Sequence, residues 1–230
     1  MTHPEQLSFI NRTLDLFPQF KSTDRLLEIG SQNINGTVRD LLRSKRYIGI
    51  DLSEAPGVDY VCQGELIELP DGWADVVIST ECFEHTENWK QILGNSIRIC
   101  TRGGIVIFTF AGLFRPAHGT IDSKDPDSSP LTQQHYANID MNAFMDAVEL
   151  SAYFDRYCFE ANSSPGDSYF WGIRSSEAYM VDMTSRDVLI DRLARAQGQL
   201  GQALSRLANA NRQLAHQEAE IRQMSDPPAS

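Results

Sequence analysis

Two acidic side chains stand at the ends of successive apolar segments and could bind one ligand together. Glu28 lies in the stretch "LLEIGSQNING" (26–36), and Asp51 ends the segment "RYIGID" about 20 residues later. Gly30 permits a sharp turn and a close approach to a ligand, and Gly36 would open a helix whose first amides favour an anionic group. Carboxylates at these positions favour a ligand that carries positive charge and has hydroxyls to donate.

The spacing of the glycines discriminates between two adenosine cofactors. A dinucleotide site needs the pattern GxGxxG, and its second glycine is missing between Gly30 and Gly36. An acid at Glu28 would repel a pyrophosphate, whereas S-adenosylmethionine carries an ammonium, a sulfonium and a carboxylate but no phosphate. Taken singly, Glu28 could be a solvated strand end, and Asp51 could be a turn or helix-capping residue aided by Ser53. Together, at this spacing, the two acids favour S-adenosylmethionine.

Three histidines are candidates for a general base, because imidazole takes up protons near neutral pH. His118 in "RPAHGT" is the first candidate, His85 in "ECFEH" the second and His135 in "QQHY" the third. A single histidine is more often a surface or core residue than a base. We expect no metal, because the sequence shows no compact cluster of acids and histidines. Asp122, Asp125 and Asp127 lie close together and leave a magnesium-dependent mechanism as an alternative, although they are more simply a solvated turn beside Pro126.

The composition limits the class of partner. The chain has 230 residues, 41% of them hydrophobic, so it can bury a core. Its formal net charge of -11 would repel the phosphates of nucleic acid. Its most apolar stretch, 105–114, is far shorter than the roughly 20 residues of a membrane-spanning helix. No secretory signal is visible, and the four scattered cysteines indicate buried thiols of a reducing compartment. We therefore expect a cytoplasmic protein with no transmembrane segment and no nucleic-acid partner.

Strands and helices alternate along the chain, and they must position these residues. Strands are expected at 25–30, 46–52, 58–62, 74–79, 103–110, 153–160 and 168–175, the last two as an antiparallel pair. Helices are expected at 2–17, 36–45, 87–101 and 141–150. The strands before residue 111 are apolar at consecutive positions, which is typical of parallel strands covered on both faces. Residues 111–140 predict a long loop that is functional or mobile.

The segment after residue 183 predicts a separate element. Apolar residues recur every seven positions at Leu193, Leu200, Leu207, Leu214 and Ile221. This pattern favours a coiled-coil helix over 184–224 and self-association through it, followed by a disordered tail over 225–230. A long helix packed on its own domain is the alternative, and Gly198 and Gly201 each weaken a helix by about 1 kcal/mol. Residues 1–183 form the predicted catalytic domain.

Four stretches resemble, in order, the motifs of class I S-adenosylmethionine-dependent methyltransferases of the type 11 kind. They are "LLEIGSQNING", "YIGIDLS", "GELIELPDGWADVVISTECFEHTENW" and "GGIVIFTF", and they cover roughly residues 25–110. The resemblance implies an α/β, Rossmann-like, doubly wound fold with a mostly parallel seven-stranded sheet, and S-adenosylmethionine as the cofactor. The sequence departs from the family where a third glycine, between Gly30 and Gly36, is replaced within "SQNIN".

The resemblance also implies contacts for the cofactor's methionine and ribose. Glu28, Gly30 and Ser31 should line the methionine end, in the loop that Gly36 closes. Asp51 should hold the ribose hydroxyls, and its neighbour Leu52 should flank the adenine.

Further contacts are implied for the adenine and for the reacting end. Glu65 should meet the adenine amino group, and Leu66 should cover the ring. Glu81 and Cys82 should lie beside the cofactor, with His85 close behind.

The expected activity is methyl transfer to a hydroxyl. A sulfonium is already a good donor, so the enzyme must align the acceptor, exclude water and remove a proton. The segment 118–136, with "HGT" at its start and "HY" at its end, resembles, more weakly, loops of methyltransferases found with bacterial surface-glycan glycosyltransferases. That likeness implies a sugar or glycan hydroxyl and a place in polysaccharide biosynthesis. Three alternatives stay open: methylation of a small-molecule metabolite, a nucleotide-dependent oxidoreductase, and a non-catalytic scaffold that presents the coiled coil.

Overall fold

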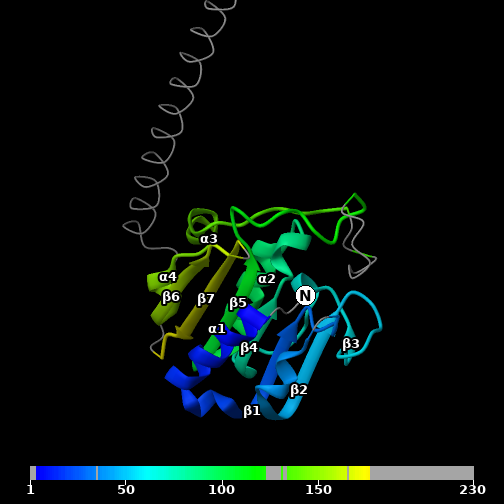
Figure 1. Ribbon diagram of the computed structural model, residues 1–230. Coiled ribbons are helices and arrows are strands. Elements are labelled where there is room, and N and C mark those ends of the chain that lie inside the picture. The colour runs from blue at the N-terminus through cyan, green and yellow to red at the C-terminus, as the bar shows by residue number, and fades with distance from the viewer. Residues whose placement is uncertain (1–3, 35, 123–130, 132–133, 165, 177–230) are drawn as a thin grey trace, which may run out of the picture. The chain divides into compact units, whose positions relative to one another are not determined.

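The computed structural model describes residues 4–34, 36–122, 131, 134–164 and 166–176. Its centre is a seven-stranded sheet in the order β3-β2-β1-β4-β5-β7-β6 (Figure 1). The strands are β1 (Ser22–Ile29), β2 (Arg43–Asp51), β3 (Tyr60–Val61), β4 (Ala74–Thr80), β5 (Cys100–Ala111), β6 (Phe154–Asn162) and β7 (Asp167–Arg174). Neighbouring strands are parallel except that β7 is antiparallel to β5 and β6. The predicted mixed sheet, mostly parallel with an antiparallel closing pair, is confirmed.

The helices flank this sheet and differ from the prediction in two places: at 36–45, and in the helix predicted over 141–150, which ends at Ala147 before a separate helix begins at Leu150. They are α1 (Pro4–Leu16), α2 (Trp89–Ile99), α3 (Met141–Ala147) and α4 (Leu150–Tyr153), with 3-10 turns η1 (Pro18–Lys21), η2 (Val38–Asp40), η3 (Gly64–Leu66) and η4 (Phe83–His85). The helix predicted over 36–45 is wrong, because only η2 forms there. β2 already begins at Arg43, which pairs with Ser22 of β1. The stretch left between Gly36 and β2 is too short for a stable helix and begins with the β-branched Thr37 and Val38.

Separate hydrophobic clusters cover the two faces of the sheet. Figure 1 shows α1 and α2 on opposite faces, where Phe9 of α1 and Ile92 of α2 are both buried. Side chains of β5 alternate between the clusters, with Ile107 on the α1 side and Phe108 on the α2 side. Each such buried side chain contributes about 1.5–3 kcal/mol to folding. The strands are therefore apolar on both faces, as their sequence indicated.

The carboxyl ends of four parallel strands meet at one edge. β1, β2, β4 and β5 all point the same way in Figure 1. In a sheet of this kind, ligands bind in the crevice outside these ends. The loops that follow the four strands are therefore the parts of the fold that can form a site.

The segment after β5 folds back over this edge. Its described residues between Gly112 and Asp140 contain no helix or strand, in agreement with the predicted loop. The amide of Ile139 donates to the carbonyl of Ala111 at 2.8 Å, and the amide of Ala137 donates to the carbonyl of Glu84 at 2.9 Å. These bonds hold the end of the loop against the turn after β4.

Some predictions fall outside the described residues. These are the coiled-coil helix (184–224), the tail (225–230) and the domain boundary after residue 183. Within the described part, no helix has the length and apolar character needed to cross a bilayer. All four cysteines are described and free, with Cys100 buried and the others partly buried.

Candidate active site

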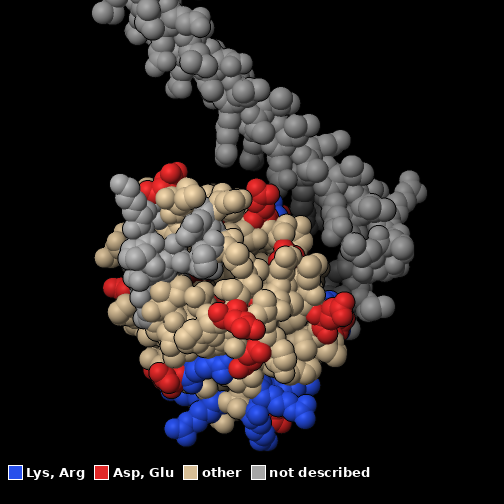
Figure 2. Space-filling model, turned by 90° about the vertical axis from the view of Figure 1, so that its right-hand side faces the viewer, with Lys and Arg blue, Asp and Glu red and all other residues tan. Residues whose placement is uncertain are grey.

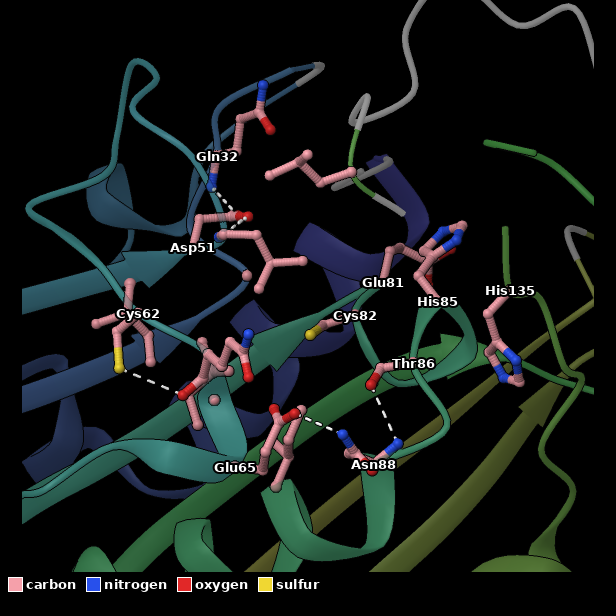
Figure 3. Close-up of a pocket in the computed structure, with 18 of the residues that line it drawn as sticks. Gln32, Asp51, Cys62, Glu65, Glu81, Cys82, His85, Thr86, Asn88 and His135 are labelled. Atoms are coloured by element: carbon pink, nitrogen blue, oxygen red, sulfur yellow. Dashed lines mark hydrogen bonds between the residues drawn. The ribbon is translucent and has the colours of Figure 1, made fainter. Parts of the chain in front are cut away.

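A cavity of about 400 Å³ lies at the carboxyl edge of the sheet (Figure 3). Its wall comes from the loop after β1, the end of β2, the segment around η3, the turn after β4 and parts of the loop after β5. Residues predicted to bind the cofactor that line it are Gly30, Asp51, Leu52, Glu65, Glu81 and Cys82. The fold thus gathers these residues, which lie far apart in the sequence, at one cavity.

Gly30 lets the loop after β1 turn toward the turn after β4. It has a φ of 79°, where glycine is favoured. A Cβ atom at this position would lie 2.9 Å from the Cβ atom of Cys82, so a larger residue would collide with the cavity wall. The amides of Gly30 and Ser31 donate to the carbonyl of Ile50 at 2.9 and 3.0 Å. The loop is therefore fixed against β2.

Asp51 joins the ends of β1 and β2. Its Oδ2 accepts a hydrogen bond from the amide of Gln32 at 3.0 Å, and its Oδ1 accepts one from the amide of Leu52 at 2.7 Å. Figure 3 shows Asp51 and Gln32 together on one side of the cavity. A carboxylate oxygen has two acceptor directions, so both oxygens can still accept a hydroxyl from a ligand.

Glu65 lies in η3 and is held by the start of α2. Its Oε1 accepts a hydrogen bond from Nδ2 of Asn88 at 2.5 Å (Figure 3), and its carbonyl accepts one from Nδ2 of Asn95 at 2.7 Å. Asn88 thus orients the carboxylate along the cavity wall, and Asn95 fixes the backbone of η3. Its second oxygen can accept a hydrogen bond from an amino group.

Four of the predicted cofactor contacts do not line the cavity. Glu28 is 2% exposed and accepts a hydrogen bond from the hydroxyl of Tyr47 at 2.6 Å. Burial raises the pKa of Glu28 to about 7. Ser31, Gly36 and Leu66 also lie off the cavity wall, and Leu66 is 64% exposed. Contacts of these four residues with a cofactor stay predictions.

The opposite side of the cavity carries Glu81, His85 and His135 (Figure 3). Glu81, directly after β4, has a φ of 51°, which costs a residue other than glycine about 1–3 kcal/mol. Its amide donates to the carbonyl of Thr109 at 2.9 Å, which holds the strained turn in place. Burial, and then the neighbouring Glu84, raise the pKa of Glu81 well above its usual range, and burial raises the pKa of Glu84 too.

The three candidate bases lie near one another but differ in access. His85 and His135 line the cavity, whereas His118 does not. The rings of His118 and His85 meet edge to face with centroids 5.2 Å apart, and Tyr136 packs against both. Burial, reinforced by His118, lowers the pKa of His85 to about 3. Nδ1 of His135 is 3.7 Å from Oε1 of Glu87.

Several polar residues of the wall were missed from the sequence. They are Gln32, Gln63, Thr86, Glu87 and Asn88. Gln32 lies between the two glycines of the opening loop, and Asn88 closely follows "ECFEH", so their positions after strand ends could have pointed to them. Gln63 directly follows the strand predicted over 58–62, so the same signal could have pointed to it.

The described cavity wall is negatively charged. Asp51, Glu65 and Glu87 give it this charge, while the buried Glu81, whose pKa is raised, keeps its proton more readily, and no lysine or arginine is among the described wall residues. On the face shown in Figure 2, most lysine and arginine side chains of the described residues gather at one end. Exposed basic residues at the start of β2 lie at the amino edge of the sheet, opposite the cavity. The cavity therefore favours cationic ligands over phosphates.

The sequence of this region matches a known family. Residues 27–108, from β1 to β5, match the model of a family described as a methyltransferase domain. The predicted class of catalytic domain is thereby confirmed for this segment. No match was found among curated proteins.

Solved structures share the fold at low sequence identity. Phosphoethanolamine N-methyltransferase 2 of Haemonchus contortus, in complex with S-adenosyl-L-methionine, is 16% identical with a TM-score of 0.50, over 72% of this chain and 52% of its own. The 1,6-didemethyltoxoflavin-N1-methyltransferase of Burkholderia thailandensis has 1,6-didemethyltoxoflavin and S-adenosylhomocysteine bound. It is 9% identical with a TM-score of 0.51, over 74% of this chain and 78% of its own. The YcgJ protein of Bacillus subtilis is 11% identical with a TM-score of 0.52, over 76% of this chain and 100% of its own. This chain spans about half the length of the first, and the likeness concerns the fold.

Proposed function

We propose that this protein is an S-adenosylmethionine-dependent methyltransferase that acts on a hydroxyl group. The charge of the cavity carries the proposal, because the acids Asp51, Glu65 and Glu87 line it and no described lysine or arginine does. Such a wall attracts the sulfonium and ammonium of S-adenosylmethionine and disfavours the pyrophosphate of a dinucleotide. Two of the similar structures hold S-adenosylmethionine or S-adenosylhomocysteine, which supports the same cofactor here.

The proposed cofactor position follows from the polar groups on the wall. Asp51 accepts hydrogen bonds from the two ribose hydroxyls, and Leu52 flanks the adenine. Glu65 accepts a hydrogen bond from the adenine amino group. The methionine end then lies along the backbone at Gly30, and the sulfonium points toward Glu81.

The acceptor lies on the histidine side of this cofactor. Of the three histidines, we favour His135 as the general base, because it lines the cavity and Glu87 stands beside its Nδ1. The base takes the hydroxyl proton, the oxygen bonds to the methyl carbon, and the C–S electron pair stays on sulfur as S-adenosylhomocysteine forms.

A sugar or surface-glycan hydroxyl is the proposed acceptor. The weak resemblance of the loop around His118 to glycan-associated methyltransferases supports it, as does the polar character of the wall near Glu81 and His135. Methylation of another small metabolite is the alternative. A cytoplasmic location and self-association through 184–224 belong to the same proposal.

Three measurements on the full chain test this function. Calorimetric titration with S-adenosylhomocysteine should show saturable binding, and fluorescence titration with NADH should show none; the opposite result would point to an oxidoreductase. Radiolabelled S-adenosylmethionine should then transfer its methyl group to a sugar or oligosaccharide fraction of cell extract. Label in a small non-sugar product would support the alternative acceptor. Binding without any transfer would support the non-catalytic scaffold.

A further inference from the structure

Two buried glutamates beside the cavity lie close together and lack well-formed hydrogen bonds from other side chains. Glu81 and Glu84 come from a single turn after β4, and their side chains are 0% exposed. By distance and angle none of their four carboxylate oxygens accepts a well-formed hydrogen bond from another described residue, and the two carboxyls lie close enough to interact with each other. A buried carboxylate without compensation is costly, so such a pair must hold protons or face a cation.

Two imidazoles face the same point. Nε2 of His118 is 3.7 Å from Oε2 of Glu81 and 4.0 Å from Oε1 of Glu84. Ligand atoms of Glu84, His85 and His118 all lie within 4.8 Å of one another. Nδ1 of His85 is buried without a hydrogen-bond partner among the described residues. Ligands at about 2.1 Å from a shared ion stand roughly 3–4.2 Å apart, so small side-chain movements would complete a coordination shell.

We propose that Glu81, Glu84, His85 and His118 form a binding site for one divalent first-row transition metal ion. Two carboxylates balance the two positive charges of the ion, so the buried site becomes neutral. Mixed carboxylate and imidazole ligands suit Mn²⁺, Fe²⁺ or Zn²⁺ better than Ca²⁺, which prefers oxygen ligands alone. The strained backbone of Glu81 fits this proposal, because it turns toward the ion a carboxylate that could otherwise be solvated.

The sequence led to the opposite expectation, that no metal binds. Glu81, Glu84 and His85 are local to one turn, but His118 comes from the loop after β5. Only the fold brings this fourth ligand to the others, so the spacing in the sequence does not show a compact cluster.

The site adjoins the proposed reaction. Glu81 and His85 line the cavity as well as the cluster (Figure 3), so an open coordination position would face the acceptor. An acceptor oxygen bound there would lose its proton more readily, and the proton would pass to His135. This role rests on the proposed function, whereas binding of the ion does not.

The test uses the full chain freed of metal with a chelator and titrated with MnCl₂ or ZnCl₂ in a calorimeter. We expect one equivalent bound, with affinity at least tenfold weaker in Glu84→Gln and in His118→Gln. Glu87→Gln and His135→Gln are matched controls that should bind the ion like the wild type. Circular dichroism and binding of S-adenosylhomocysteine report whether each variant is folded.

The outcomes separate this proposal from the proposed function. If folded wild-type protein binds neither ion, or if Glu84→Gln and His118→Gln bind like the wild type, the metal site is overturned and a proton shared by the two carboxyls explains their burial. Binding of the ion without binding of S-adenosylhomocysteine would keep the metal site and refute the cofactor.

Discussion

The carboxylate of Asp51 accepts a hydrogen bond from the backbone amide of Gln32 at 3.0 Å, so the end of β2 holds the loop that follows β1. The same carboxylate lines the cavity and remains able to accept further hydrogen bonds. One side chain therefore shapes the cavity and presents an acceptor to the ligand.

Replacing Asp51 should weaken cofactor binding. Loss of hydrogen bonds to a charged group removes about 1.5–3 kcal/mol, so Asp51→Ala should raise the Kd for S-adenosylhomocysteine about 10- to 100-fold in calorimetry. Asp40→Ala is the matched control, because Asp40 is exposed and off the cavity wall. Equal affinities of wild type and Asp51→Ala would refute the ribose assignment.

Substitution of Gly30 should destabilise the fold. Gly30→Ala adds a Cβ atom 2.9 Å from that of Cys82 at a φ of 79°, and we expect a loss of about 1–3 kcal/mol in the free energy of unfolding. Gly94→Ala, inside α2 with open space around its Cβ position, should instead gain about 0.5–1 kcal/mol. Urea unfolding measures both changes, and a neutral Gly30→Ala would contradict the described loop.

Glu28 should make stability depend on pH. Its pKa is about 7 in the folded protein against 4.5 normally, so the unfolded chain loses its proton first as the pH rises. Stability from this group is therefore complete below about pH 4.5 and declines up to about pH 7, by about 3 kcal/mol at most.

The variant Glu28→Gln isolates this effect. Between about pH 4.5 and pH 7 the wild type should lose stability relative to Glu28→Gln, as measured by the free energy of unfolding in urea titrations. Glu54→Gln, at an exposed position, should show a constant difference from the wild type. Parallel profiles for wild type and Glu28→Gln would mean that Glu28 ionises normally.

Loss of the proposed base should slow the reaction without weakening the cofactor. General base catalysis contributes roughly 10²- to 10⁴-fold, so His135→Gln should lower kcat by that order once an acceptor is in hand. The Kd for S-adenosylhomocysteine should stay unchanged in calorimetry. His216→Gln, in the predicted coiled-coil segment, is the control. An unchanged kcat in His135→Gln would return the role of base to His85 or His118.

The heptad pattern predicts self-association through the tail. In analytical ultracentrifugation the full chain should sediment as a dimer or larger species, and a chain ending at Met183 should sediment as a monomer. The result would contradict the coiled coil if both chains were monomers.

The sequence predicted the strands that position the site better than it predicted the contacts between the side chains of the site. Consecutive apolar residues define β1, β4 and β5, and a parallel sheet places whatever follows such strands at one edge. For that reason Gly30, Asp51 and Glu81 could be placed together from local patterns. The helix expected over 36–45 was wrong because Arg43 pairs with Ser22 of β1. This pairing joins segments distant in the sequence, and the spacing of apolar residues within 36–45 does not reveal it.

Contacts between distant segments were not accessible in the same way. The hydroxyl of Tyr47 donates a hydrogen bond to the carboxylate of Glu28, although the position of this acid at a strand end suggested that it meets a ligand. Likewise, His118 approaches Glu81 only because the long loop folds back over the turn after β4. Such pairings depend on side-chain packing, which no single stretch of sequence specifies.

The absence of lysine and arginine from the described cavity wall bears on turnover. A sulfonium donor enters with a positive charge at sulfur and leaves as an uncharged thioether. An anionic pocket therefore holds the fresh donor more tightly than its spent form, by an electrostatic margin that rising ionic strength would shrink. Methyl transfer itself therefore assists release of the product S-adenosylhomocysteine. Inhibition by this product should be mild in dilute buffer and stronger, relative to the affinity for the donor, in concentrated salt.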